Sequence, residues 1–175
     1  MSSVPALSTL LLCVLYPVWL LAGAVDWLCH RATHIETTSG SHESWLHLAQ
    51  FLSLAGFLAV VMLRPYGATA LFASGTAVAI HTALSYVDVR YTLKRGRFIS
   101  SLEQHVHGFL DVIPWVAFAL WIVMNLQNTS PAANAWHMET RGTLLVLGSY
   151  AVLAGSPVLN ELRRTLRFRP SVRDG

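Results

Sequence analysis

Residues 102–126 read LEQHVHGFLDVIPWVAFALWIVMNL. The second half of this stretch is almost wholly apolar, and the whole stretch exceeds the ~20 residues that a helix needs to cross the hydrocarbon core of a membrane. The first half carries Glu103, His107 and Asp111, spaced four residues apart, so these side chains share one face of a helix. The stretch therefore predicts a membrane helix with a polar face at one end.

The composition of the chain agrees with a membrane setting. Apolar residues make up 54% of its 175 residues and charged residues only 12%, which is too little charge to cover the surface of a soluble domain. The net charge of +3 comes from basic residues at the ends of apolar segments. Such a distribution does not form a phosphate-binding patch, so we expect membrane lipid and not nucleic acid as a partner.

Four further apolar segments complete the expected fold, which is an all-α, polytopic membrane bundle of five transmembrane helices. The five spans together are interpreted as a single transmembrane domain over residues 1–160, which a basic cytoplasmic tail at 161–175 follows. The first segment ends in Ala22-Gly23-Ala24, which resembles a signal-peptidase site, but the absence of a basic region before it favours a retained helix. The four additional spans are expected at Leu7–His30, Glu43–Leu63, Gly67–Val89 and Arg141–Leu159.

The basic residues predict the orientation of the bundle. With five spans, the first-to-second loop, the third-to-fourth loop and the C-terminus share one face, and most Lys and Arg residues fall there, whereas the opposite face has little beyond Arg64 and Arg141. The positive-inside rule then places the N-terminus outside and the basic face in the cytoplasm. We expect an integral protein of the bacterial inner membrane.

Ionisable side chains recur near the ends of the expected spans, where burial in lipid is costly unless a side chain has a partner or a function. The first span carries a carboxylate and an imidazole four residues apart, and so do the second and fourth. The third offers the same two groups seven residues apart. Because successive helices alternate in direction, all four sets fall at the cytoplasmic level. The candidate metal ligands are Asp26, His30, Glu43, His47, His81, Asp88, Glu103, His107 and Asp111.

Four helices that supply carboxylates and imidazoles at one level match the ligands of a dinuclear non-haem site. The sequence therefore predicts two metal ions, iron before manganese or zinc, surrounded by four of the five helices. His81 and Asp88 lie about 10.5 Å apart along a helix axis, so one of them is expected to orient a ligand without binding metal itself. The residues expected to border the site or to hydrogen-bond its ligands are Arg31, His34, Ser85, Arg90, Tyr91 and His105.

The acid–histidine pairs resemble those of the ferritin-like di-iron carboxylate proteins, although these use Glu-x-x-His and this chain has one more residue in each pair. The setting resembles the membrane fatty-acid desaturases and hydroxylases, which bind two metal ions at the cytoplasmic face. His30 and His34 fit their first histidine box, and their His-x-x-His-His box is absent. The stretch from Ser101 to Pro114 also resembles an uncharacterised family of bacterial integral membrane proteins, and this likeness implies no activity.

These observations favour an oxidoreductase that activates O2 to hydroxylate, desaturate or N-oxygenate an apolar or lipid-like small molecule. The chain has no glycine-rich nucleotide motif, so we expect no nucleotide cofactor and an external electron donor. The sequence assigns no catalytic residue. The alternatives are a zinc-dependent hydrolase of lipids, a divalent-metal transporter, a bis-histidine haem protein, and a proton relay or structural polar network without metal.

Overall fold

A computed structural model describes residues 4–127 and 139–168, and every regular element in these ranges is helical. The first long helix consists of α1, a π-helical turn η1 and α2, and a 3-10 turn η2 leads into α3. After α4 and α5, the last long helix consists of α6, a second π-helical turn η3 and α7. The bounds are α1 Val4–Leu10, η1 Leu11–Leu15, α2 Tyr16–Ala32, η2 Ile35–Thr37, α3 Ser41–Leu63, α4 Ala68–Lys94, α5 Ser101–Leu126, α6 Thr140–Ser149, η3 Tyr150–Ala154 and α7 Gly155–Arg167.

Five of these helical stretches are long and apolar enough to cross a membrane, which confirms the predicted all-α bundle with five candidate spans. Their lengths are 29, 23, 27, 26 and 28 residues, all above the ~20 residues that the hydrocarbon core requires. Each span agrees with its predicted segment, and most of them extend a few residues further at one or both ends. The fold is compatible with an integral membrane protein.

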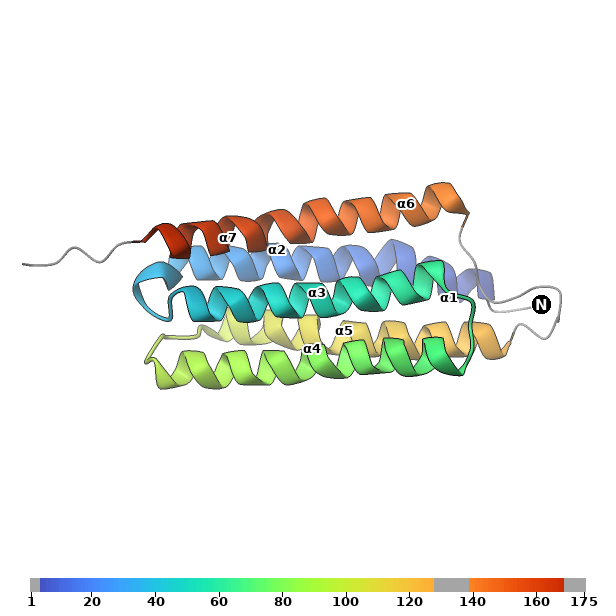
Figure 1. The fold of residues 1–175 in the computed structure, drawn as a ribbon, viewed down its shortest axis with the longest axis horizontal. Coiled ribbons are helices and arrows are strands. Elements are labelled where there is room, and N and C mark those ends of the chain that lie inside the picture. Colours follow the sequence, from blue (N-terminus) through green and yellow to red (C-terminus); the bar gives the residue numbers. More distant parts are fainter. Residues whose placement is uncertain (1–3, 128–138, 169–175) are drawn as a thin grey trace, which may run out of the picture.

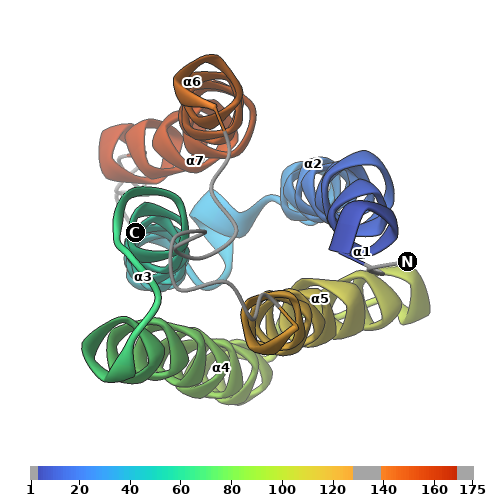
Figure 2. The same cartoon turned by 90° about the vertical axis from the view of Figure 1, so that its right-hand side faces the viewer.

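The helices form a ring around the interior of the bundle (Figure 2). Going round the ring, α2 packs on α5, α5 on α4, α4 on α3 and α3 on α7, and the last long helix returns to α2. All five spans therefore surround the interior, whereas only four of them were expected to surround the metal site. The difference arises because α7 packs on both α2 and α3 and completes the ring.

The last helix also runs further than the sequence indicates. The domain boundary was expected at residue 160, yet α7 continues to Arg167 and buries Glu161, Leu162 and Thr165. The repeated arginines of this segment suggested a surface tail. In the structure they lie on the outer face of α7, and the other face of the helix is buried. Residues 161–167 are thus part of the bundle, and residues 169–175 lie outside the described ranges.

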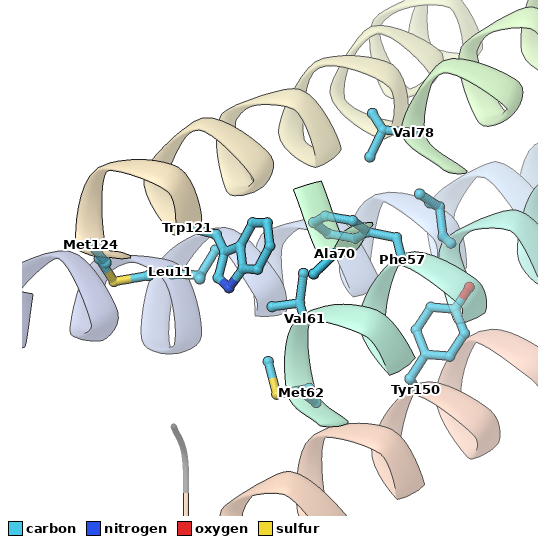
Figure 3. Packing of buried hydrophobic residues seen from close by; sticks show 10 residues of the cluster. Leu11, Phe57, Val61, Met62, Ala70, Val78, Trp121, Met124 and Tyr150 are labelled. Carbon is cyan, nitrogen blue, oxygen red and sulfur yellow. The ribbon is translucent and has the colours of Figure 1, made fainter. Parts of the chain in front are cut away.

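The two ends of the bundle differ in chemistry. The α2–α3 connection, the α4–α5 connection and the C-terminal end of α7 lie together at one end (Figure 1), and we call it the basic end because most of the Lys and Arg side chains lie there. The hydrophobic core occupies the other half, where Phe57, Val61, Trp121 and Met124 pack with Tyr150 (Figure 3). The Phe57 and Phe118 rings meet edge to face at 6.4 Å, a favourable arrangement for aromatic side chains.

Candidate metal centre

Buried polar side chains from all five spans meet toward the basic end of the bundle. They comprise five carboxylates, three imidazoles and one guanidinium, and nearly all are less than a tenth exposed. Such groups are buried in proteins only when they are paired or hold a ligand. We call this set the polar cluster: Asp26, His30, Glu43, His47, Asp88, Arg97, Glu103, His107 and Glu161.

Local structure aims several of these side chains inward. Ser100 is the N-cap of α5, and its Oγ accepts a hydrogen bond from the Glu103 backbone N–H at 3.1 Å. Gly96 has a φ of +72°, in the left-handed region that favours glycine. This turn follows the end of α4 directly and places Arg97 over the interior. Gly40, with a φ of +71°, is the N-cap of α3. It sets where this helix begins and so places Glu43 in the first turn.

Glu161 joins two of the imidazoles. Its Oε2 lies 2.9 Å from Nδ1 of His30, and its Oε1 lies 2.6 Å from Nδ1 of His47. The two rings stack with centroids 4.5 Å apart and an interplanar angle of 1°. On its other side, Nε2 of His47 lies 3.0 Å from Oδ2 of Asp88. A single carboxylate from α7 thus spans ligand candidates of α2 and α3.

Asp26 and Asp88 connect the third imidazole, His107, to the same set. Nδ1 of His107 lies 3.4 Å from Oδ1 of Asp26, and its Nε2 lies 3.9 Å from Oδ2 of Asp88. Asp26 also approaches Nε2 of His30 through its other oxygen, at 3.6 Å. Each of these two carboxylates therefore lies between two imidazoles.

Arg97 provides the positive charge of the cluster. Its guanidinium donates to Glu43 Oε1 at 2.8 Å, to Glu103 Oε1 at 2.6 Å and to Thr33 Oγ1 at 3.0 Å. Burial alone would lower the pKa of Arg97, but the hydrogen bond to Glu103 and the charge of Glu43 raise this pKa above its usual value. Arg97 therefore stays charged and neutralises part of the acidic set.

The polar cluster passes two tests of fit for metal ions. In each of two groups, Asp26–His30–His107 and His30–Glu43–His47, the possible ligand atoms all lie within 4.8 Å of one another. Metal–ligand bonds of about 2.0–2.2 Å place neighbouring ligand atoms about 3–4 Å apart, so each group would contract on binding an ion. The two groups share His30. Second, several buried atoms make no hydrogen bond within the described residues: Asp26 Oδ1, His30 Nε2, Glu43 Oε2, Asp88 Oδ1 and Glu103 Oε2.

The charges also suit two divalent ions. Arg97 balances one of the five carboxylates, so four negative charges remain when the three imidazoles are neutral, as metal binding requires. Two divalent cations would neutralise these four charges. Without cations, the carboxylates repel one another unless protons bind to the imidazoles. The charges are therefore compatible with two divalent ions, and three protonated imidazoles would instead leave one net negative charge.

His81 and Asp111 form a separate pair beside the polar cluster. Nε2 of His81 lies 3.7 Å from Asp111 Oδ1, and Ser85 donates a hydrogen bond to Asp111 Oδ2 at 3.0 Å. The structure thus brings seven of the nine predicted ligands into the cluster and places these two next to it. Of His81 and Asp88, one of which was expected to orient a ligand only, Asp88 is the residue that approaches both His47 and His107.

The remaining residues predicted to border the site lie apart from the polar cluster. His34 follows the end of α2, has a 73% exposed side chain and faces Glu36. His105 is exposed and lies 2.7 Å from the Ser101 carbonyl oxygen. In the described ranges, neither imidazole forms a hydrogen bond or ion pair with the cluster.

The other three bordering residues are engaged locally. Arg31 lies over the Trp27 ring at 5.0 Å, and Arg90 lies over the Tyr86 ring at 5.8 Å. Tyr91 donates a hydrogen bond to the Ser39 carbonyl oxygen at 3.2 Å. Tyr91 therefore holds the α2–α3 connection to α4, and the two arginines remain at the surface.

Two members of the polar cluster were not predicted as site residues. Glu161 was assigned to a surface tail, although it is the one acid among the arginines of residues 160–169 and helical spacing places it beside the buried Leu162 and Thr165. Arg97 was counted only as an orienting charge of the basic end. Its position directly after a glycine and before the capping Ser100 was the available signal of a tight turn that could point inward.

Comparisons with known proteins identify no family. No protein-family model matches the chain, and neither the curated proteins nor the solved structures give a match. The likeness to di-iron carboxylate proteins and to membrane desaturases stays a prediction. The function is therefore proposed from the polar cluster and its surroundings.

Proposed function

We propose that the polar cluster binds two iron ions and that the protein is a membrane-embedded oxidoreductase that uses O2 to hydroxylate, desaturate or N-oxygenate an apolar substrate. One observation carries this proposal. Five buried carboxylates and three buried or nearly buried imidazoles from five helices lie together, with several ligand atoms left without a hydrogen bond among the described residues. Mixed carboxylate and imidazole ligands suit iron and manganese, and the carboxylates bridge and neutralise paired ions.

The number of candidate ligands favours this reading over zinc hydrolysis, because a catalytic zinc ion needs about three protein ligands and a water molecule. The gathering of these ligands at one end, with a hydrophobic core in the other half, also differs from the path that a metal transporter requires. Haem ligation would use the imidazoles but not the surrounding acids.

When bound, paired iron ions would supply the electron transfer to O2. In a hydroxylation, one oxygen atom enters a C–H bond of the substrate and the other becomes water, with two electrons and two protons from an external donor. The residues of this chain hold the metal ions in a mostly water-excluded site, and Arg97 holds Glu43 and Glu103 in place. A soluble reductase at the basic end is the partner that fits this chemistry.

The reaction of the reduced protein with O2 tests this proposal. Iron-loaded protein in lipid nanodiscs is reduced without air and then mixed with buffer that contains O2. We expect uptake of O2 on an oxygen electrode together with oxidation of both ferrous ions in the Mössbauer spectrum. Ferrous ions that persist in air, or a centre that takes up only zinc, would contradict the proposal.

We also propose that the basic end faces the cytoplasm of a bacterial cell. Arg31, Arg90, Lys94, Arg95 and Arg97 lie at this end, together with three arginines of α7, and basic loops stay inside. A green fluorescent protein fused after Gly175 is therefore expected to fluoresce, whereas alkaline phosphatase fused there should be inactive. An active phosphatase fusion with a dark fluorescent one would reverse the orientation.

A further inference from the structure

A cavity borders the polar cluster on the side that faces the apolar half of the bundle. Its volume is about 90 Å³, and four members of the cluster line it: Asp26, His30, His47 and Glu161. The rest of its wall is mostly apolar and comes largely from the first and last long helices, with Leu20, Leu153 and Val158 among the lining side chains. An apolar molecule in this cavity would therefore touch the candidate metal ligands.

A second cavity lies next to the first, on the side toward the opposite end of the bundle. Its volume is about 60 Å³, and the two share Trp19 and Leu54 as lining residues. Its wall consists of apolar and aromatic side chains such as Leu11, Phe57 and Ala117. The two volumes add up to about 150 Å³, and an apolar cavity of this size inside a protein binds a small hydrocarbon.

Both π-helical turns of the described chain lie along these cavities. Leu11 and Leu15 of η1 line the second cavity, as does Tyr150 of η3, while Leu153 and Ala154 of η3 line the first. A π-helical turn adds a residue to a helical turn and frequently occurs at functional sites. Here the two turns occur in the first and last long helices, which line both cavities together with α3. The position of the turns therefore supports the view that this space holds a ligand.

The lining residues of the two cavities cover a length comparable with that of an alkyl chain, and one of them is exposed on the outer surface of the bundle. On α3 their walls extend from His47 to Met62, which is about 22 Å along the helix axis. One leaflet of the hydrocarbon core is about 15 Å thick. Leu153 lines the first cavity and is 55% exposed, and Gly23 presents no side chain on the facing helix. The wall of the first cavity between the first and last long helices therefore includes an exposed leucine of η3 and a glycine of α2.

We propose that the paired cavities bind an unbranched alkyl chain, which slides in from the membrane between the first and last spans and lies with one segment against Asp26 and His30. This inference names the substrate class and rests on the proposed function of the polar cluster. Its two possible sources, a free fatty acid and the acyl chain of a phospholipid, share this chemistry.

Photochemical labelling tests the inference. The full-length protein is placed in nanodiscs that contain a fatty acid with a diazirine on its chain or, separately, a phosphatidylcholine with the same chain. After irradiation, adducts are mapped by mass spectrometry. We expect adducts on the interior residues Leu54 and Phe57, which are 3% and 5% exposed, as well as on the lipid-facing Phe72, which is 75% exposed.

A pair of matched variants tests the route. Gly23 and Leu110 both line the first cavity, and a Cβ at Gly23 would lie 3.9 Å from Leu110, so Gly23→Leu fills this space. It should reduce interior adducts about tenfold, which corresponds to about 1.4 kcal/mol of lost binding, without changing the Phe72 adducts. Gly148→Leu is the control because Gly148 is exposed and nothing lies within 4 Å of its added Cβ.

Each outcome is decisive. Interior adducts with the fatty acid alone identify a free chain as the ligand, and interior adducts with both probes identify membrane lipid. Wild-type adducts confined to exposed residues, or interior adducts that persist in Gly23→Leu, would overturn the inference. Metal analysis of the same samples separates the two proposals. Two iron ions without interior adducts contradict the alkyl-chain site alone, and interior adducts in a protein that cannot bind metal contradict the proposed function.

Discussion

The His47→Ala variant is expected to lose both metal ions, while the wild-type protein retains two per chain. The His47 imidazole lies between Glu161 and Asp88, with one nitrogen toward each carboxylate. Its loss removes a ligand and also frees the two carboxylates that it holds in position. Metal content is measured by elemental analysis of protein purified in detergent, and gel filtration verifies that the variant is still folded.

The matched control for this loss is His105→Ala. His105 is an exposed histidine on α5 whose ring lies 2.7 Å from the Ser101 carbonyl oxygen. This variant should bind as much metal as the wild-type protein, since the histidine that it removes is outside the polar cluster. Two metal ions in folded His47→Ala protein would show that the cluster is not the site.

The Arg97→Ala variant is expected to destabilise the metal-free protein by about 3–5 kcal/mol. Arg97 is 5% exposed and pairs with two fully buried carboxylates, Glu43 and Glu103, and removal of one partner from a buried ion pair leaves uncompensated charge of this cost. The loss should be smaller in the metal-loaded protein, because the metal ions stabilise the same carboxylates. Chemical unfolding in detergent, with and without a chelator, measures both.

Arg90→Ala is the control for this second effect. The Arg90 side chain is exposed and lies against Tyr86 on its own helix, and exposed arginines contribute little to stability. If Arg97→Ala lowers the free energy of unfolding as little as Arg90→Ala does, the role assigned to Arg97 is contradicted. Arg97→Lys should fall between these variants, because a single ammonium group cannot match the three acceptors that the guanidinium reaches.

Periodicity predicted much of the site because its ligands are local pairs on long helices. Asp26 with His30, and Glu103 with His107, lie one turn apart on one face, and helices that alternate in direction bring such pairs to a common level. The structure brings these residues and the pair Glu43–His47 together, as expected. The five apolar segments were equally clear, because membrane spans are long and uniform in composition.

Two members of the polar cluster were not predicted, because their positions depend on tertiary structure. Arg97 belongs to a short connection between helices, and its direction depends on the turn at Gly96 and not on a helical period. Glu161 belongs to a helix with an exposed basic face, and the burial of its other face follows from packing against α3. The separation of His81 from Asp88 along α4 did predict that these two residues would have different roles. The structure places His81 with Asp111 and Asp88 with His47.

The most direct test of the central claim is the metal content of purified wild-type protein, combined with its Mössbauer and visible spectra. The polar cluster predicts two iron ions per chain, a Mössbauer signal of coupled high-spin iron and no Soret band. A Soret band would instead indicate haem, and one zinc ion per chain would indicate a hydrolytic centre. Protein that is folded and stable without any bound metal, and that takes up none when iron is supplied, would contradict the account.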